Sequence, residues 1–226
     1  MLICLEGIDG SGKATQTQLL LEHLRQRLGP QRVTSLSFPR YGESFFAAEV
    51  AAYLNGDRGT LEQVDPHFAA MLFAGDRFEA CAGIKQALAA GQVIVCDRYV
   101  ASNTAHQGAR LPTAERTAFA DWNDRLEHEI YGLPRPDLIL FIDTPPALAW
   151  EMVARKAARD YTARKRDIQE AKADYLREVY QVYQQLQQAQ GWSRIDCAES
   201  GQMRSPDAIA SDILALVDAE LDARSD

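Results

Sequence analysis

The sequence predicts an α/β fold in which helices cover both faces of a parallel sheet. Short apolar runs alternate along the chain with longer segments of helical periodicity, the pattern typical of such a sheet. The runs Val93–Cys96 and Leu138–Ile142 are continuously apolar rather than alternating, as burial on both faces requires. Helix boundaries are also marked, because Gly29 ends one periodic segment and Ser205 stands before Pro206 as an N-cap.

These signals give the order of the elements. Strands are expected at Leu2–Glu6, Arg32–Phe38, Val93–Asp97, Leu138–Asp143 and Ser193–Cys197. Helices are expected at Lys13–Leu28, Glu43–Leu54, Pro66–Ala90, Thr113–Ile130, Ala147–Ala158, Gln169–Gln190 and Pro206–Leu221. No stretch is long enough to link two domains, so residues 1–226 are expected to form a single domain.

Composition limits the classes of function. The chain has 24 Lys and Arg against 32 Asp and Glu, and its net charge of −8 argues against broad binding to nucleic acid or to an anionic membrane. The four cysteines form no CxxC pair, so neither a disulfide framework nor a zinc site is expected. The first apolar run ends at Glu6, which is too short for a signal peptide, and no run has the length of a membrane-spanning helix. A cytoplasmic location is therefore expected.

A glycine-rich turn follows the first strand directly and precedes the first helix. Its glycines let consecutive backbone N–H groups point into one nest at the positive end of the helix dipole, where a polyphosphate is favoured. The lysine at its end is placed to reach the β- and γ-phosphates of a nucleotide. The residues expected to bind ATP are Gly7, Ile8, Asp9, Gly10, Ser11, Gly12, Lys13, Ala14 and Thr15. The alternative interpretation is a strand-to-helix turn without a ligand.

The position after this lysine departs from the usual phosphate-binding motif. That motif has Ser or Thr there to bind Mg²⁺, whereas this chain has Ala14 and places the hydroxyl one residue later, at Thr15. A methyl group cannot ligate a metal. Mg²⁺ is therefore expected to be held by phosphate oxygens, waters and carboxylates, with Asp9 and Asp97 as the candidate ligands.

Asp97, Arg98 and Tyr99 follow the third strand, at the edge where open α/β sheets bind ligands. The planar Arg98 guanidinium suits a phosphate, while Asp97 suits a metal ion or a water. A salt bridge at the strand end, without a ligand, is the alternative. A second arginine, Arg77, has the same two interpretations, and Phe38–Tyr41 is either a packing turn or a stacking platform for a base.

Together these segments resemble the thymidylate kinase family over nearly the whole chain. The matching segments are, in order, Leu5–Lys13, Phe38–Gly42, Leu72–Arg77, Asp97–Asn103, Gly132–Leu138 and Leu140–Asp143. The resemblance implies a P-loop three-layer fold with a five-stranded parallel sheet, a mobile lid and a homodimer. It also implies in-line transfer of the ATP γ-phosphoryl group to dTMP, giving dTDP for dTTP synthesis, with Mg²⁺ as the cofactor.

The resemblance also implies roles in binding the acceptor. Asp9 is expected to contact the deoxyribose 3′-hydroxyl, and Phe73 to stack on thymine. Arg77 and Asn103 are expected to hydrogen-bond the edge of the base, and Arg98 to hold the acceptor phosphate. The full set expected around the acceptor is Asp9, Pro39, Tyr41, Phe73, Arg77, Arg98, Ser102, Asn103, His106 and Gln107. Many family members carry Tyr in place of His106, near the sugar 2′ carbon, so discrimination against ribose stays open.

A basic stretch at about residues 155–167 falls where the family places a lid over ATP. The phosphate-binding loop carries no arginine, and in this the chain resembles the family subtype whose lid arginines supply positive charge in the transition state. The catalytic residues expected are Lys13, Asp9, Arg98, Arg155, Arg159 and Arg164, with Arg166 behind them. The alternative for this stretch is a solvated, charged helix.

Three other functions stay open from the sequence. The first is a kinase of the same fold that acts on another nucleotide or on a nucleoside. The second is a P-loop NTPase whose hydrolysis drives an interaction with a partner. The third is a non-catalytic descendant, which Ala14 and His106 keep open. Assaying phosphate transfer from ATP to a panel of acceptors discriminates among them.

Overall fold

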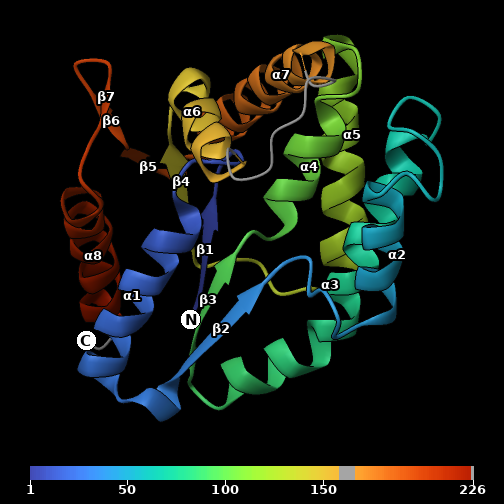
Figure 1. The fold of residues 1–226 in the computed structure, drawn as a ribbon. Helices are drawn as coiled ribbons and strands as arrows, with labels where there is room; N and C mark the ends of the chain where they lie inside the picture. The colour runs from blue at the N-terminus through green and yellow to red at the C-terminus, as the bar shows by residue number, and fades with distance from the viewer. Residues whose placement is uncertain (158–165, 225–226) are drawn as a thin grey trace.

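A computed structural model shows a central parallel sheet with helices on both faces (Figure 1). It describes residues 1–157 and 166–224, and the side chains of residues 155–172 are not described. The strands are β1 (Leu2–Glu6), β2 (Val33–Ser37), β3 (Val93–Asp97), β4 (Leu138–Asp143) and β5 (Ser193–Asp196). They pair in parallel in the order β2-β3-β1-β4-β5. The predicted fold class is confirmed, and each strand lies within one residue of its predicted bounds.

The helices form the two outer layers. They are α1 (Lys13–Leu28), α2 (Phe45–Leu54), α3 (Pro66–Ala89), α4 (Val100–Gly108), α5 (Arg116–Asp124), α6 (Pro146–Ala157), α7 (Arg166–Gln190) and α8 (Pro206–Ala223). Helices α1 and α8 cover one face of the sheet, while α3, α4 and α7 cover the other (Figure 1). As predicted, Gly29 ends α1 with φ 89°, and the Ser205 hydroxyl caps α8 by accepting the N–H of Ala208.

Strand β1 shows why the sheet needs both layers, since all five of its residues are buried. Ile3 and Leu5 belong to the core under α1 and α8, whereas Leu2 and Cys4 belong to the core under α3. This alternation is the pleat of a strand with two apolar faces. Parallel pairing with β3 and β4 sets the direction of β1, and so places the loop that follows Glu6 at the carboxyl edge of the sheet.

The helix α4 was not predicted from the sequence. Its residues include Ser102, Asn103 and Thr104, which are weak helix formers, and Tyr99 before it offers no side-chain cap. The cap instead comes from a distant strand, because the Glu6 carboxylate accepts the backbone N–H of Tyr99 at 2.7 Å. A helix start that depends on a residue from another part of the chain leaves no local sequence signal.

Other differences from the predicted elements are small. The helix expected at Thr113–Ile130 consists of the 3₁₀ turn η2 (Thr113–Glu115), α5 and the π-helical turn η3 (Arg125–Ile130). A 3₁₀ turn, η1 (Pro30–Arg32), precedes β2, and β6 (Ala198–Glu199) and β7 (Gln202–Met203) form a short antiparallel hairpin. Over the described residues, none of the helices combines the length and the apolarity needed to cross a bilayer.

Candidate active site

Two cavities meet at the carboxyl edge of β1 and β3. One, of about 540 Å³, lies over the glycine-rich loop and is lined by Lys13, Ala14 and Thr15 among others. The other, of about 240 Å³, lies between the ends of the strands and the helices α2, α3 and α4, and we call it the acceptor cleft. Asp9 and Arg98 line both cavities, so the two sites share one wall.

The glycine-rich loop needs its glycines for two separate reasons. Gly10 and Gly12 have φ values of 81° and 93°, in the left-handed region that side chains disfavour. Gly10 also lies so close to α6 that a Cβ there would sit 2.3 Å from the Ala149 carbonyl oxygen. The loop is tied to β4 as well, because the Thr144 hydroxyl donates to the Ser11 carbonyl at 3.1 Å. These contacts fix the curled backbone without a ligand.

Lys13 is folded back over this loop. Its Nζ donates to the carbonyl oxygens of Gly7 and Ile8 at 2.8 and 2.7 Å, and the side chain is buried. Burial and then the neighbouring Arg98 charge lower the pKa of Lys13 to about 7. An anion bound over the loop would favour the charged ammonium and raise this pKa again.

Arg98 stands at the junction of the two cavities. Its backbone has φ 69°, a left-handed conformation that costs a non-glycine residue about 1–3 kcal/mol and is common at functional sites. The guanidinium pairs with Asp9 and donates to the carbonyl of Gly7 at 3.2 Å and to the hydroxyl of Ser102 at 3.2 Å. Five donors in a fixed fork are thus held at the mouth of the acceptor cleft.

A buried carboxylate supports this arrangement from below. Glu6 is fully buried and accepts the hydroxyls of Ser102 at 2.6 Å and Tyr183 at 3.0 Å, besides the N–H of Tyr99. Burial raises its pKa, although these hydrogen bonds and the Arg98 charge oppose the rise. Glu6 therefore joins β1, α4 and α7 beneath Arg98. The sequence analysis assigned it only to a strand, since its three partners lie more than 90 residues away.

Asp9 carries charge at the rim of both cavities. Burial alone would raise its pKa, but the neighbouring charge of Arg98, together with that of Lys13, outweighs burial and lowers the pKa to about 2. Asp9 is therefore ionised over the whole physiological range. It can accept a hydroxyl group or contribute to a cation site without a change of protonation.

The acceptor cleft brings together all ten residues that were predicted around the acceptor. They are Asp9, Pro39, Tyr41, Phe73, Arg77, Arg98, Ser102, Asn103, His106 and Gln107. Four lining residues were not predicted, namely Tyr53, Leu54, Leu61 and Tyr175, and a fifth, Phe38, belongs to the segment that was interpreted as either a packing turn or a stacking platform. Tyr175 comes from α7, and only the fold brings it close to α4.

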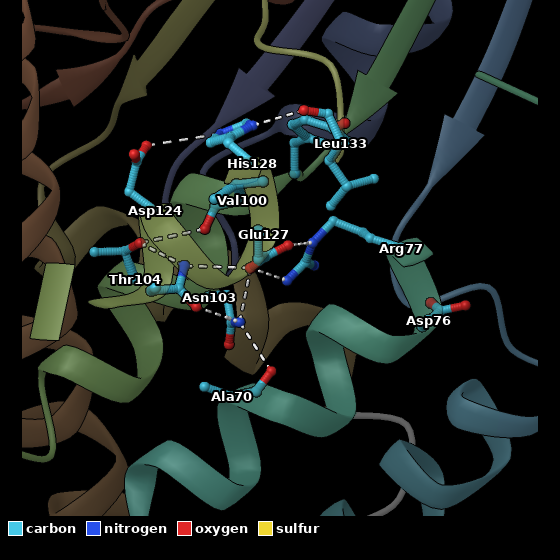
Figure 2. Close-up of polar contacts among 12 residues, drawn as sticks. Ala70, Asp76, Arg77, Val100, Asn103, Thr104, Asp124, Glu127, His128 and Leu133 are labelled. Carbon is cyan, nitrogen blue, oxygen red and sulfur yellow. Dashed lines mark hydrogen bonds and ion pairs between the residues drawn. The ribbon is translucent and has the colours of Figure 1, made fainter. Parts of the chain in front are cut away.

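The inner end of the cleft is suited to a flat heterocycle. Phe73 provides an aromatic wall, with the Tyr53 ring edge-on to it at a centroid distance of 6.4 Å. Arg77 and Asn103 are both buried beside it and both interact with the Glu127 carboxylate (Figure 2). An aromatic face together with fixed polar groups is the usual composition of a site for a base.

His106 lines the acceptor cleft and contacts Arg98. Its Nε2 accepts from the Arg98 guanidinium at 3.3 Å, while the Tyr175 hydroxyl donates to its carbonyl oxygen at 2.9 Å. Burial and the Arg98 charge lower the pKa of His106 to about 3. The imidazole is therefore neutral, and it adds no charge to the acceptor site.

Comparisons with known proteins agree with this geometry. The family model described as thymidylate kinase matches residues 5–204. A thymidylate kinase of Mycobacterium tuberculosis is 38% identical over 192 residues, which cover 85% of this chain and 87% of the relative. The chain belongs to the thymidylate kinase family. This membership identifies it as a kinase and supports dTMP as the acceptor.

Two further relatives extend the comparison. A thymidylate kinase of a Synechococcus species is 32% identical over 224 residues, covering 98% of this chain and 96% of the relative. The crystal structure of thymidylate kinase from Ehrlichia chaffeensis matches with a TM-score of 0.66 at 20% identity, over 96% of this chain and 98% of that one. The similarity of that structure supports the fold alone.

One buried residue, Asp76, holds the loop Phe38–Gly42. Asp76 accepts the backbone N–H of Arg40 at 2.8 Å and its Nε at 3.0 Å, and also the Ser44 hydroxyl at 2.6 Å. These bonds position Pro39 and Tyr41 as a wall of the cleft. The sequence motif contains Asp76, but its role is visible only once α3 lies beside this loop.

The structure describes the predicted metal ligands but not the predicted lid arginines. Asp9 and Asp97 both line the cavity over the loop. Within the described residues, no group of three or more His, Cys, Asp or Glu side chains is arranged to hold a metal by itself. Arg159 and Arg164 lie outside the described residues, as does the side chain of Arg155.

Proposed function

We propose that this chain transfers the γ-phosphoryl group of ATP to dTMP by in-line attack, producing dTDP for dTTP synthesis. The observation that carries the proposal is the shared wall of the two cavities, where Asp9 and Arg98 face both. One nucleotide in each cavity brings two phosphate ends to the same place. Such positioning is the main requirement of phosphoryl transfer, because the reaction needs no covalent protein intermediate.

On the donor side, the loop amides and Lys13 bind the ATP phosphates. The ammonium moves from the carbonyls of Gly7 and Ile8 to the phosphate oxygens, which offer a full negative charge in place of two dipoles. Thr15 donates a further hydrogen bond. The lid arginines Arg155, Arg159 and Arg164 are proposed to neutralise charge in the transition state, in line with the family resemblance.

On the acceptor side, Arg98 holds the dTMP phosphate and Asp9 the 3′-hydroxyl. The proposal is supported by the position of Arg98 at the junction and by its fixed fork of donors. The acceptor phosphate is already ionised at neutral pH, so no general base is needed. Phe73 stacks on the thymine, and Arg77 and Asn103 bind its edge.

The residues over the loop fit Mg²⁺ when nucleotide phosphates complete its coordination. The donor set is hard oxygen, two carboxylates at Asp9 and Asp97, and Mg²⁺ prefers such ligands together with phosphates and waters. Bound Mg²⁺ supplies positive charge against the transferred phosphoryl group. Ala14 removes the usual hydroxyl ligand, so the carboxylates take a larger share of the binding.

A homodimer is proposed through the exposed apolar face of α2, α3 and η3. Helix α3 packs against both α2 and η3, and the large side chains Phe45, Phe68, Phe78 and Ile130 of these three elements are each at least half exposed. Such a patch is typical of an association surface. Light scattering should give a dimer for the wild type and a monomer for Phe68→Glu. A monomeric wild type at micromolar concentration contradicts this proposal.

The cytoplasmic location stays a prediction.

The test of the proposed function is an acceptor panel with ATP and Mg²⁺. We expect rapid formation of dTDP from dTMP, slower reaction with dUMP, and little reaction with UMP, dCMP or thymidine. A coupled assay for ADP, with product identification by chromatography, measures each rate. ATP hydrolysis that is unaffected by any acceptor contradicts the proposal and favours an NTPase.

A further inference from the structure

Glu127 is a buried carboxylate that lies beneath the acceptor cleft without lining it. The residue is fully buried and lies on the π-helical turn η3. Its carboxylate accepts hydrogen bonds from the side chains of three residues. Arg77 donates to it from Nε and from Nη2, the latter at 2.7 Å, and Asn103 and Asn123 donate from Nδ2 at 2.9 and 3.2 Å. Figure 2 shows the Glu127 carboxylate between Arg77 and Asn103. A carboxylate at this depth is tolerated because it is paired with a cation and hydrogen-bonded.

This pairing fixes the direction of the Asn103 side-chain amide. Its Nδ2 faces three acceptors, the Ala70 carbonyl at 3.0 Å, Asn123 Oδ1 at 3.0 Å and Glu127 Oε1 at 2.9 Å. A reversed amide would place Oδ1 against three oxygens, each of which can only accept. The loss of several buried hydrogen bonds makes that orientation strongly unfavourable.

The Asn103 oxygen is left without a partner. Oδ1 is buried and makes no hydrogen bond to any described residue, although Asn103 lines the cleft. Buried acceptors are normally satisfied, and an exception beside a cavity points to a ligand donor. Asn103 therefore offers the cleft an acceptor and not a donor.

Arg77 is constrained by the same carboxylate. Glu127 accepts Nε and Nη2, while Nη1 makes no hydrogen bond to any residue that the structure describes. Arg77 also lines the cleft. The two side chains together present one donor, from Arg77, and one acceptor, from Asn103. In a thymine or uracil imide, the N3–H can donate to Asn103 and O4 can accept from Arg77. Cytosine has the reverse pattern, an acceptor at N3 and a donor amino group, so both of its groups would face a group of the same kind.

Asn123 completes the arrangement from α5. Its Oδ1 accepts from Asn103, and its Nδ2 donates to the Thr104 hydroxyl at 3.0 Å as well as to Glu127. Asn123 is fully buried, and it lies one turn before Glu127 on a continuous helical stretch. The Thr104 hydroxyl and the Glu127 carboxylate both accept from Asn123 Nδ2, and this sets the direction of the Asn123 amide. Asn123 Oδ1 therefore faces Asn103, and Glu127 orients Asn103 both directly and through Asn123.

We propose that Glu127, supported by Asn123, is a positioning residue that fixes the donor and acceptor order at the base end of the cleft. It thereby selects imide pyrimidines over amino pyrimidines without touching the substrate. This inference rests on the proposed function, since it assigns a base to that end of the cleft. A purely structural Glu127 would stabilise the protein but leave the preference between bases unchanged.

Glu127→Gln tests the proposal because it exchanges a group that only accepts for one that also donates. One N–H of the network then faces another donor, so a carboxylate no longer fixes the donor and acceptor order of Arg77 and Asn103. We expect the ratio of kcat/KM for dTMP to kcat/KM for dCMP to fall at least about tenfold, because a site built for one hydrogen-bonding pattern loses its discrimination. For dTMP, kcat/KM should fall mainly because KM rises, while KM for ATP stays unchanged.

Two further variants separate the effect from folding and from charge. Glu127→Asp keeps a carboxylate that only accepts, so the ratio should stay within about threefold of wild type even if activity falls. Glu129→Gln removes the same charge from an exposed position of the same turn and should leave the ratio unchanged. Circular dichroism and Tm report folding, and a collapsed ratio in a folded Glu127→Asp overturns the inference even if Glu127→Gln does not fold.

The outcomes are distinct. The inference is overturned if the ratio stays unchanged in Glu127→Gln, including by a parallel fall of both rates. It is also overturned if the ratio collapses in Glu127→Asp. In either case dTMP phosphorylation by the wild type stands. A wild type that phosphorylates no pyrimidine nucleotide overturns the proposed function and this inference with it. A ratio that falls only in Glu127→Gln supports the inference.

Discussion

The glycine-rich loop and the acceptor cleft are made from different parts of the chain. The loop presents backbone N–H groups and one lysine, all within residues 7–15, and its shape depends on glycine conformations. The cleft is made of side chains from the strand ends and from α2, α3, α4 and α7, and buried carboxylates orient them. A backbone site recognises charge, whereas a side-chain site can recognise a particular base. The variants below are designed to separate the two.

The largest effect is expected from Lys13→Ala. Loss of the ammonium removes charge stabilisation of the transferred phosphoryl group, so kcat should fall by about a thousandfold or more. The affinity for dTMP should be nearly unchanged, because Lys13 lines the loop cavity and not the acceptor cleft. Steady-state kinetics and dTMP titration measure both, with the exposed Lys85→Ala as the control. Near-normal turnover removes the loop from the mechanism.

A smaller and more selective effect is expected from Arg98→Lys. The change keeps the charge but loses the planar fork, so kcat/KM for dTMP should fall about a hundredfold while KM for ATP changes little. Arg135→Lys, at a position 61% exposed, is the matched control. If both nucleotides are weakened equally, the division of the site into a donor half and an acceptor half is wrong.

ATP binding should be coupled to a proton through Lys13. With a pKa of about 7, the lysine of the free protein is mostly neutral at pH 8 and mostly charged at pH 6. Bound phosphates return its pKa toward the usual value of about 10.4, so binding should take up close to one proton at pH 8 and little at pH 6. Calorimetry in buffers of different ionisation enthalpy measures the uptake. Lys13→Arg, which stays charged, should show none, and equal uptake at both pH values contradicts the coupling.

The smallest effect is expected from His106→Tyr. The larger ring should narrow the cleft where His106 lies beside Arg98 and Tyr175, the position that the family resemblance assigns to the sugar. We expect the preference for dUMP over UMP to rise about threefold to tenfold, with the rate for dTMP nearly unchanged, since a steric contrast of one group is worth about 1–3 kcal/mol at most. Rates for the two nucleotides measured side by side decide this. An unchanged preference places the 2′ carbon away from this residue.

The difference between the two regions also determines what could be predicted from the sequence. The strands and the loop Gly7–Lys13 follow from local patterns, namely apolar runs and glycine spacing, and the five-stranded sheet is confirmed. The helix α4 could not be predicted, because Glu6 caps it from 93 residues away. Glu127 is surrounded in sequence by charged residues and looks like part of a solvated surface, yet the fold buries it completely.

We propose that the two cavities bind two nucleotides whose phosphates meet between Asp9 and Arg98. The most direct test is a crystal structure of the protein with dTMP and a non-hydrolysable ATP analogue. We predict thymine against Phe73, the dTMP phosphate on Arg98, and the γ-phosphate of the analogue beside Lys13, with the two phosphates adjacent. Either nucleotide in another place, or phosphates too far apart to react, contradicts the claim.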